Sequence, residues 1–486
     1  MLTRRHILGT GAAGLAMLVG GCATSGVTPR GSALASDARL MRRAYETLHP
    51  GLYRYNTKPE MDALFDRLEA DWAKGPALSE AYLSLSGLLA KVRCGHSYAN
   101  FYNQSAAVSE AVFAGPGKLP FLFMWLNGRM VVTDPQGTDG LARGDTIERI
   151  NGRPSSDVLK ALLPYVRADG NNTAKRVSLM SVSGLDRFET FDVFDGLVFG
   201  RRERFTLDIK AVDGTRRKIE AASITLAERQ ARMTPEPKGG AVFTRRFEAN
   251  GACVLTMPSW GLYNSDWDWK GYIDETFNEI ANRKTPALIV DLRGNEGGLD
   301  CGDEILARVI TADLERTAYE RRVRYQKTPT DLDPYLDTWD KSFRDYSAST
   351  EPLGDGFYRL IERDGESRTP IAAKGPRFDG RLIVLTDAAN SSATFQFANL
   401  VKANGLGTLV GETTGGSQRG INGEAFFFLR LPESGLEVDV PLIGTFPLTP
   451  KPDSGIDPDV FAAPTPASLA AGSDLVLAAA LAIVGG

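Results

Sequence analysis

Three sets of residues in this sequence have the types needed for nucleophilic catalysis, although they lie far apart along the chain. Ser392 stands where an apolar strand ends and a helix, predicted over 393–403, begins, so unpaired helix N–H groups would face its hydroxyl. Gly297 and Gly298 follow another buried strand, where glycines let the backbone approach a ligand and present N–H groups. His96, far upstream, is of the residue type that removes a proton from a serine.

A serine activated in this way attacks a carbonyl carbon, and the negative oxygen that forms needs hydrogen-bond donors. The N–H of Ala393, together with one from Gly297 or Gly298, is the donor pair that the arrangement predicts. Taken alone, Ser392 also fits a second interpretation, because a serine before a helix commonly serves as an N-cap. The wider pattern around it favours catalysis.

That pattern consists of three short segments in a fixed order, which are Asp291–Gly298 (DLRGNEGG), Asn390–Phe395 (NSSATF) and Gly411–Gly416 (GETTGG). They resemble the DLRxNxGG, SAS(E) and GExTxG segments of the tail-specific, or C-terminal processing, proteases. The resemblance implies a crotonase/ClpP-like α/β catalytic core, with Ser392 as nucleophile and with Thr414 and Ser417 lining the site. It also implies peptide or protein substrates.

The position of the general base departs from the classical members of this family, which use a lysine just after the GExTxG segment. Here that position is Ser417, and glutamine and arginine follow it. A branch similar to the tricorn core protease uses instead a histidine in a GH[ST] motif, which matches His96 in Gly95-His96-Ser97. The alternatives are that His96 is an ordinary core histidine, or that His49, in a turn-like segment, borders the cleft.

A catalytic histidine is usually held in the correct tautomer by an acid or a hydroxyl. In the tricorn-like branch an acid near a C-terminal GxxPD turn contributes, and the matching segment here is 452–459. Asp453 is nearest to the equivalent position. An ordinary aspartate in a Pro/Gly turn explains it equally well.

The first residues have the features of an export signal. Arg4 and Arg5 precede an uncharged run that ends at Cys22, and their context resembles a twin-arginine signal with a lipoprotein cleavage box. We therefore expect an exported protein on the periplasmic side of the membrane, attached only through a lipid on Cys22. A plain signal peptide with an incidental cysteine is the alternative.

The rest of the chain divides by its hydrophobic pattern into further parts. An Asn127-Gly128 pair between apolar runs predicts a hairpin. The string GLARGDTIERING at 140–152 resembles the second half of a PDZ domain, although a small β module without a peptide groove fits as well. The expected parts are a signal (1–22), a flexible tether (23–36), a helical region (37–112), a PDZ-like β module (113–235) and the α/β catalytic core (236–486), which ends in an apolar helix near 475–484.

The remaining cysteines are Cys94, Cys253 and Cys301, an odd number, so at least one thiol is unpaired. Cys94 lies two residues from His96, but no oxyanion turn is near it in sequence, and we expect it to be structural. The sequence contains no HExxH motif, which argues against a metallopeptidase, and no G-x-S-x-G motif, which argues against an α/β-hydrolase. We expect no metal and no cofactor.

The composition excludes some classes of function. The 56 Lys and Arg nearly balance the 60 Asp and Glu, so no basic surface for nucleic acid is indicated. The sequence therefore predicts a serine endopeptidase that works through an acyl-enzyme at Ser392 with His96 as base. A lipid-anchored peptide-binding protein without turnover, or a hydrolase of non-peptide esters or amides, is the alternative.

Overall fold

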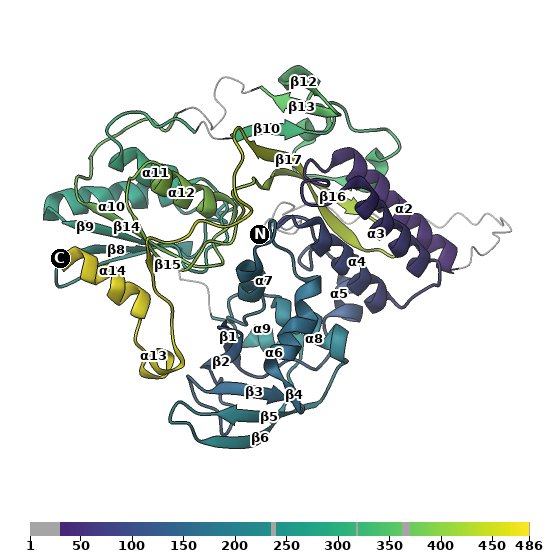
Figure 1. Ribbon diagram of the computed structural model, residues 1–486, viewed down its shortest axis with the longest axis horizontal. Helices are drawn as coiled ribbons and strands as arrows, with labels where there is room; N and C mark the ends of the chain where they lie inside the picture. Colours follow the sequence, from purple (N-terminus) through teal and green to yellow (C-terminus); the bar gives the residue numbers. More distant parts are fainter. Residues whose placement is uncertain (1–29, 235–239, 317–318, 362–369, 486) are drawn as a thin grey trace.

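The computed structural model describes residues 30–234, 240–316, 319–361 and 370–485, and Figure 1 shows how their elements are arranged. The expected signal and Cys22 lie outside these residues. Within the described ranges, no helix has the length and apolar character needed to cross a membrane.

The N-terminal part consists of helices α2 (Arg30–Leu48), α3 (Lys58–Trp72), α4 (Leu78–Val92) and α5 (Ala106–Val112). Helix α3 begins with a capping box in which Thr57 and Glu60 each accept the other's backbone N–H. The expectation of a flexible tether over 23–36 needs correction, because residues 30–36 form the first turns of α2. Leu34 and Ala35 are both only 5% exposed there, since they pack into the helical layer.

The β module is an antiparallel sheet in the order β1-β2-β3-β5-β6, with β4 paired to β3. Its hairpin at Asn127-Gly128 is confirmed, and both residues have the positive φ, 50° and 73°, that a tight turn of this kind requires. The strands are β1 (Leu122–Leu126), β2 (Arg129–Asp134), β3 (Thr146–Ile150), β4 (Arg153–Pro154), β5 (Arg204–Lys210) and β6 (Arg216–Ala222). The helices are α6 (Ser155–Leu162), η1 (Leu163–Tyr165), α7 (Thr173–Leu179), α8 (Thr190–Phe199) and α9 (Leu226–Ala231).

The predicted α/β layer contains a sheet in the order β18-β15-β14-β9-β8-β7, in which only the β7–β8 pairing is antiparallel. Its strands are β7 (Thr244–Phe247), β8 (Cys253–Thr256), β9 (Ala287–Asp291), β14 (Arg381–Thr386), β15 (Thr408–Gly411) and β18 (Val460–Phe461). Apolar residues of α10 (Trp269–Arg283), α11 (Cys301–Val309) and α12 (Ser392–Ala403) cover one face. The other face packs against α14 (Leu475–Gly485), which confirms the apolar C-terminal helix and follows α13 (Pro466–Ala471).

A second sheet, which the sequence pattern did not predict, also comes from the C-terminal half of the chain. Its order is β11-β16-β17-β10-β13-β12, and all its pairings are antiparallel. The strands are β10 (Tyr319–Val323), β11 (Leu336–Asp337), β12 (Thr350–Gly354), β13 (Phe357–Leu360), β16 (Asn422–Arg430) and β17 (Glu437–Pro447), and short 3₁₀ turns lie at η3 (Asp333–Tyr335), η4 (Lys341–Arg344) and η5 (Ser347–Ser349).

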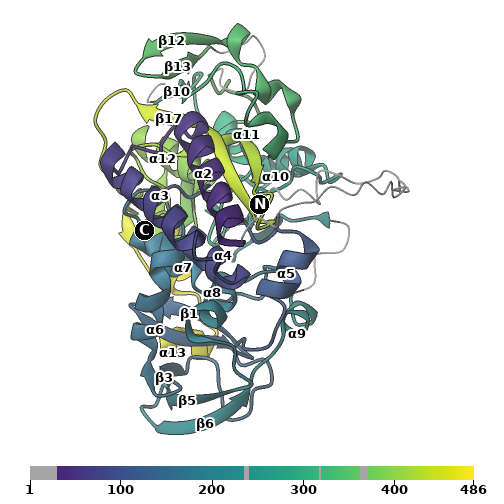
Figure 2. The ribbon, with the colours of Figure 1, turned by 90° about the vertical axis from the view of Figure 1, so that its right-hand side faces the viewer.

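This second sheet packs with the N-terminal helices rather than with the α/β layer, as Figures 1 and 2 show from two directions. One continuous apolar core joins it to those helices and to the β module, whereas the α/β layer has cores of its own. The backbone N–H groups of Glu433 and Ser434 donate to the fully buried carboxylate of Asp37 on α2, at 3.1 and 2.7 Å. The turn between β16 and β17 is thereby attached to the first helix.

Candidate active site

Ser392 is the first residue of α12, directly beyond the loop that follows β14. Its backbone has a φ of 52°, in the left-handed region that residues with a side chain seldom adopt. Its neighbours Ser391, Ala393 and Thr394 are buried, while Ser392 itself is half-exposed. A serine held in a strained conformation at a helix start, with its side chain partly open to solvent, is typical of an active-site residue rather than of a simple cap.

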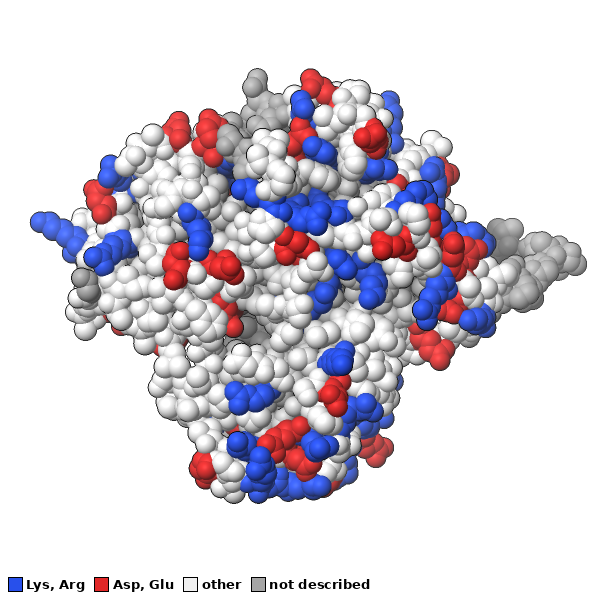
Figure 3. Space-filling model, in the orientation of Figure 1, with Lys and Arg blue, Asp and Glu red and all other residues white. Residues whose placement is uncertain are grey.

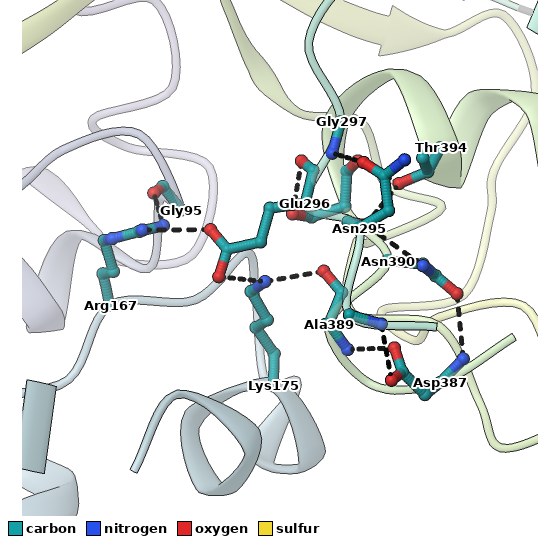
Figure 4. Close-up of polar contacts among 12 residues, drawn as sticks. Gly95, Arg167, Lys175, Asn295, Glu296, Gly297, Asp387, Ala389, Asn390 and Thr394 are labelled. Atoms are coloured by element: carbon teal, nitrogen blue, oxygen red, sulfur yellow. Dashed lines mark hydrogen bonds and ion pairs between the residues drawn. The ribbon is translucent and has the colours of Figure 1, made fainter. Parts of the chain in front are cut away.

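Hydrogen bonds tie the loop before Ser392 to the loop after β9 (Figure 4). The side-chain amide of Asn390 donates to the carbonyls of Leu292 and Asn295, at 2.6 and 3.0 Å. The hydroxyl of Thr394 also donates to the Asn295 carbonyl, at 3.0 Å, and that of Ser391 donates to the Glu296 carbonyl, at 3.2 Å. Ser392 and the glycine turn are therefore held as one unit.

Both glycines of this turn are required by their surroundings. Gly297 and Gly298 have φ values of 101° and 139°. A Cβ at Gly297 would lie 2.9 Å from the Cβ of Ser392, and one at Gly298 would lie 2.1 Å from the carbonyl oxygen of Trp260. The backbone of the turn therefore passes directly beside the nucleophile.

The structure distinguishes between the expected oxyanion donors. The N–H of Gly297 donates to the side-chain oxygen of Asn295, at 2.9 Å. The N–H groups of Gly298 and Ala393 have no acceptor among the described residues, and that of Ala393 belongs to the first helical turn, where no intrahelical partner exists. Gly298 and Ala393 are therefore the pair available to a developing oxyanion, and Gly297 has a supporting role.

His96 lies in a short segment after α4, and its ring packs against β16. A Cβ added at Gly423 would be 3.6 Å from the His96 ring, and the ring centroid of Phe426 is 5.8 Å away. The His96 Nδ1 is buried and has no hydrogen-bond partner among the described residues. Burial is the main cause that lowers the pKa of His96, so the ring is neutral and able to accept a proton near pH 7.

No hydrogen bond between His96 and Ser392 occurs in the described part of the chain. Glu296 connects the two residues indirectly. Its charge raises the pKa of His96, and it directly precedes Gly297, which lies beside Ser392. Catalytic hydrogen bonds in a ligand-free protein are often long and shorten when substrate binds.

The second histidine, His49, is part of the scaffold. It is 1% exposed, its Nδ1 accepts the N–H of Gly51 at 3.1 Å, and its Nε2 lies 2.8 Å from the hydroxyl of Ser97. Both ring nitrogens are therefore engaged, with the proton on Nε2. His49 holds the residue that follows His96 and is not free to act as the base.

Asp453 has partners other than His96. Its carboxylate accepts from the hydroxyl of Ser417, at 3.0 Å, and from the side-chain amide of Asn171, at 2.7 Å. Among the acidic groups, Asp169 has the largest effect on the pKa of His96, which its charge raises. The carboxylate of Asp169 accepts the N–H of Gly95, at 2.8 Å. These contacts do not support the orienting role expected for Asp453.

Thr414 and Ser417 are fully buried in the loop after β15. The Thr414 hydroxyl accepts the N–H of Ile456, at 2.8 Å, and the Ser417 hydroxyl also accepts from Tyr55, at 3.1 Å. In the same loop, the N–H of Gly415 donates to the carbonyl of Asn390, at 2.6 Å. These residues connect the C-terminal turn to the nucleophile loop.

A mostly buried cluster of charges, which sequence reasoning missed, joins all these parts (Figure 4); the side chains of Lys175, Arg167 and Glu296 are 2%, 11% and 31% exposed. The carboxylate of Glu296 lies 3.3 Å from Arg167 and 3.3 Å from Lys175. Arg167 also donates to the carbonyl of Gly95, at 2.7 Å, and Lys175 donates to that of Ala389, at 2.7 Å. Burial raises the pKa of Glu296, but the two cations outweigh it and bring the pKa to about 2. Glu296 therefore stays ionised between the base segment and the nucleophile loop.

The three cysteines of the described residues are unpaired. Cys94, Cys253 and Cys301 are all buried as free thiols. Burial raises the pKa of Cys94, and the side-chain amide of Asn422 donates to its sulfur at 3.4 Å. A buried thiol that resists ionisation is a poor nucleophile, which agrees with a structural role.

The surface charge is mixed. On the face shown in Figure 3, Lys and Arg alternate with Asp and Glu, and neither sign dominates a large area. This distribution agrees with the net charge of −4.

His49 makes the stability of the fold depend on pH. Burial lowers its pKa from the ordinary 6.5 to about 3, so between these values the unfolded chain binds a proton that the folded chain does not. Its contribution to stability is therefore lost as pH falls below 6.5, by up to about 1.4 kcal/mol per unit. We expect urea unfolding at pH 7, 6 and 5 to show a weaker pH dependence in His49→Gln than in the wild type. Parallel losses in both proteins would contradict this.

Glu296 is expected to matter for turnover although it touches no reacting atom. Glu296→Gln removes the charge that holds Arg167 and Lys175 together, so the glycine turn and the base segment lose their common anchor. We expect kcat to fall by about 10²-fold, as for other small misplacements of catalytic groups. The measurement is steady-state peptide hydrolysis on protein whose thermal unfolding shows that it is folded.

The matched control is Glu148→Gln, which breaks an exposed ion pair with Arg216 and should leave kcat unchanged. Equal kcat values for the two folded variants would show that Glu296 has no positioning role.

Comparison with known proteins places this site in a family. Residues 251–460 match the model of Peptidase family S41. No curated protein matches the chain. Among solved structures, mature CPAF complexed with lactacystin has a TM-score of 0.59 at 13% identity, covering 91% of this chain and 96% of that chain. Another structure of mature CPAF has a TM-score of 0.58 at 15% identity, covering 91% and 94%. At these identities the two structures show the fold alone.

The matched region contains the glycine turn, the strained serine at the start of α12 and the loop that packs against it. The histidine, the β module and the N-terminal helices lie outside that region, whereas each CPAF structure covers 91% of the chain. Residues 251–460 therefore carry a peptidase family S41 domain, and this domain identifies the protein as a serine peptidase.

Proposed function

We propose that this peptidase hydrolyses peptide bonds through an acyl-enzyme on Ser392, with His96 as general base. The observation that carries the proposal is the positive φ of Ser392 at the start of α12, directly beside the Gly297-Gly298 turn. His96, neutral near pH 7, accepts the Ser392 proton as Oγ attacks the peptide carbonyl carbon. The N–H groups of Ala393 and Gly298 hold the oxyanion.

In the second half of the reaction His96 donates its proton to the leaving amine nitrogen, and the C–N bond breaks. Water then attacks the Ser392 ester while His96 accepts its proton, and His96 passes this proton to Ser392 Oγ as the Oγ–acyl carbon bond breaks and the acid product leaves. Because burial lowers the pKa of His96, the acid limb of the pH profile of kcat/KM lies below 6.5.

A lysine base remains the rival within the same reaction. Lys175 is 2% exposed, and burial lowers its pKa. Its ammonium group is bonded to the Ala389 carbonyl and paired with Glu296, whereas the His96 Nδ1 has no such partner among the described residues. These contacts favour His96.

We expect a fluorophosphonate probe to label wild-type Ser392 and not Ser392→Ala, and His96→Ala to lose at least about 10³-fold in kcat. Ser347→Ala, which removes an exposed serine, is the control and should be labelled as the wild type is. Labelling of Ser392→Ala would exclude Ser392 as nucleophile. A His96→Ala rate near wild type, with a Lys175→Met variant that is inactive, would transfer the base role to Lys175.

The same labelling and hydrolysis assays also distinguish the peptidase from two alternative functions. Absence of labelling and of hydrolysis in the wild type would favour a peptide-binding protein without turnover. Hydrolysis of simple esters but of no peptide would favour a non-peptide hydrolase. The charge cluster around Glu296 argues for an assembled catalytic site, because a fully buried lysine beside a largely buried arginine is costly and is seldom maintained without a use.

The β module is proposed to be PDZ-like and the α/β layer to be crotonase/ClpP-like. The PDZ proposal rests on the GLARGDTIERING string, which forms β3 and the turns at its two ends. An experimental structure of the whole protein, compared with PDZ domains, tests it.

Export and lipidation are likewise a proposal, and rest on Arg4, Arg5 and Cys22. We expect the native host to incorporate labelled fatty acid into the wild-type protein and not into Cys22→Ala, because the acyl chains attach at that cysteine. A Cys22→Ala protein that still incorporates label would contradict a lipid anchor at this residue. Secretion of an unlabelled wild-type protein would indicate a plain signal peptide.

A further inference from the structure

An aromatic cluster, formed by Trp339, Phe343 and Phe426, extends from the proposed base. The Phe426 ring lies 5.8 Å from the His96 ring, the Trp339 indole 5.8 Å from Phe426, and Phe343 5.3 Å from Trp339, measured between centroids. The rings therefore form a continuous line that begins at His96. Phe426 comes from β16, Trp339 from the segment that links β11 to η4, and Phe343 from η4 itself.

Packing against the apolar core beneath the second sheet accounts for Phe343 but not for Trp339 or Phe426. Trp339 and Phe426 are only half-buried, and they are not part of the apolar core beneath the second sheet. The next residues of β16 are both buried, Phe427 in that core and Phe428 against Trp339, with ring centroids 5.8 Å apart. Large aromatic side chains left partly exposed in a contiguous group usually mark a binding surface.

An irregularity of β16 places Phe426 where it is. The pairing of β16 with β17 shifts register between Gly423 and Phe426, and Glu424 within this shift has a φ of 64°. A bulge of this kind re-aims the side chains that follow it, and bulges are common beside active sites. Gly423, which has no side chain, leaves the backbone of β16 in contact range of the His96 ring.

The chemistry of the base decides which part of a substrate would lie here. A histidine that protonates the leaving amine must lie on the leaving-group side of the scissile bond. The substrate residue that follows the scissile bond would therefore lie against a surface that is continuous with the His96 ring. Aromatic faces and edges hold apolar and aromatic side chains, and the carboxylate of Glu424 is neutralised by Arg321, at 2.6 Å.

We propose that the aromatic cluster is a subsite for an apolar, preferably aromatic, side chain on the leaving-group side of the cleaved peptide bond. The proposal rests on the proposed peptidase function and adds the substrate class to it. It makes Trp339 a residue that determines specificity without taking part in proton transfer.

The test begins with unfolded casein, digested by the wild type and analysed by mass spectrometry to locate the cleaved bonds. One cleaved sequence is then made as internally quenched peptides with Phe, Leu, Gln or Asp after the scissile bond. We expect Phe and Leu to exceed Asp by at least about 10-fold in kcat/KM, which is the scale of discrimination by an apolar pocket. Trp339→Ala should bring this ratio close to one.

The fluorophosphonate probe distinguishes a lost subsite from a lost site, because it carries no residue on the leaving-group side. Trp339→Ala should therefore be labelled at the wild-type rate. Trp339→Phe, which keeps an aromatic ring, should retain the preference. The control is Trp267→Ala, which removes a half-buried tryptophan packed on Phe243 in the α/β layer and should leave the ratio unchanged.

A wild type that cleaves without preference after the bond, or whose preference is set only by the residue before it, overturns the proposal. The proposal is also overturned if Trp339→Ala is labelled by the probe and still prefers Phe and Leu to Asp after the scissile bond. If Trp339→Ala is not labelled, two milder variants decide the question. Trp339→Phe must keep the preference for Phe, and Phe426→Leu must weaken it. A wild type that neither labels nor cleaves refutes the peptidase function itself, which is a different outcome.

Discussion

The hydrogen bonds between the loop before α12 and the loop after β9 are the constraint on which the rest of the site depends. Asn390 and Thr394 donate hydrogen bonds to carbonyl groups of the glycine loop, and the Gly297 N–H donates to the side-chain oxygen of Asn295. This closed set of bonds gives the backbone no freedom to relax the positive φ of Ser392. It also explains why both glycines are needed: the two loops approach so closely that a single Cβ in the turn would meet neighbouring backbone.

Around this unit the protein assembles charges rather than apolar contacts. Arg167 and Lys175 come from the β module, whereas Glu296 comes from the α/β layer, so one ionised glutamate connects two parts of the fold at the site. Such a buried arrangement contributes little to stability, because desolvation offsets the attraction between the charges. Its value lies in geometry: the carbonyl groups of Gly95 and Ala389 are fixed by the same two cations that hold Glu296.

Local signals in the sequence were sufficient for the place of Ser392 at the start of a helix, the hairpin at Asn127-Gly128 and the α/β layer, because each depends on adjacent residues. The charge cluster could not be predicted in this way, since Arg167, Lys175 and Glu296 look like ordinary surface charges until the fold buries them. The second sheet escaped for a related reason: its strands pair across long separations, and β16 and β17 had no distinctive pattern apart from the alternating apolar residues that any core strand has. His49 and His96 were separable only by their partners, which are tertiary contacts.

The attachment of β16 and β17 to the N-terminal helices has a consequence for how the enzyme comes into being. His96 belongs to the first hundred residues, but the strand against which it packs begins at Asn422. Asp37, likewise near the start of the chain, accepts hydrogen bonds from the backbone of Glu433 and Ser434. Contacts of such high sequence separation form late in folding. A chain still being synthesised therefore contains both the serine and the histidine, but it lacks the strand against which the histidine packs. The topology thus delays the placement of His96 beside β16 until nearly the whole chain is present, much as a propeptide delays the maturation of an enzyme.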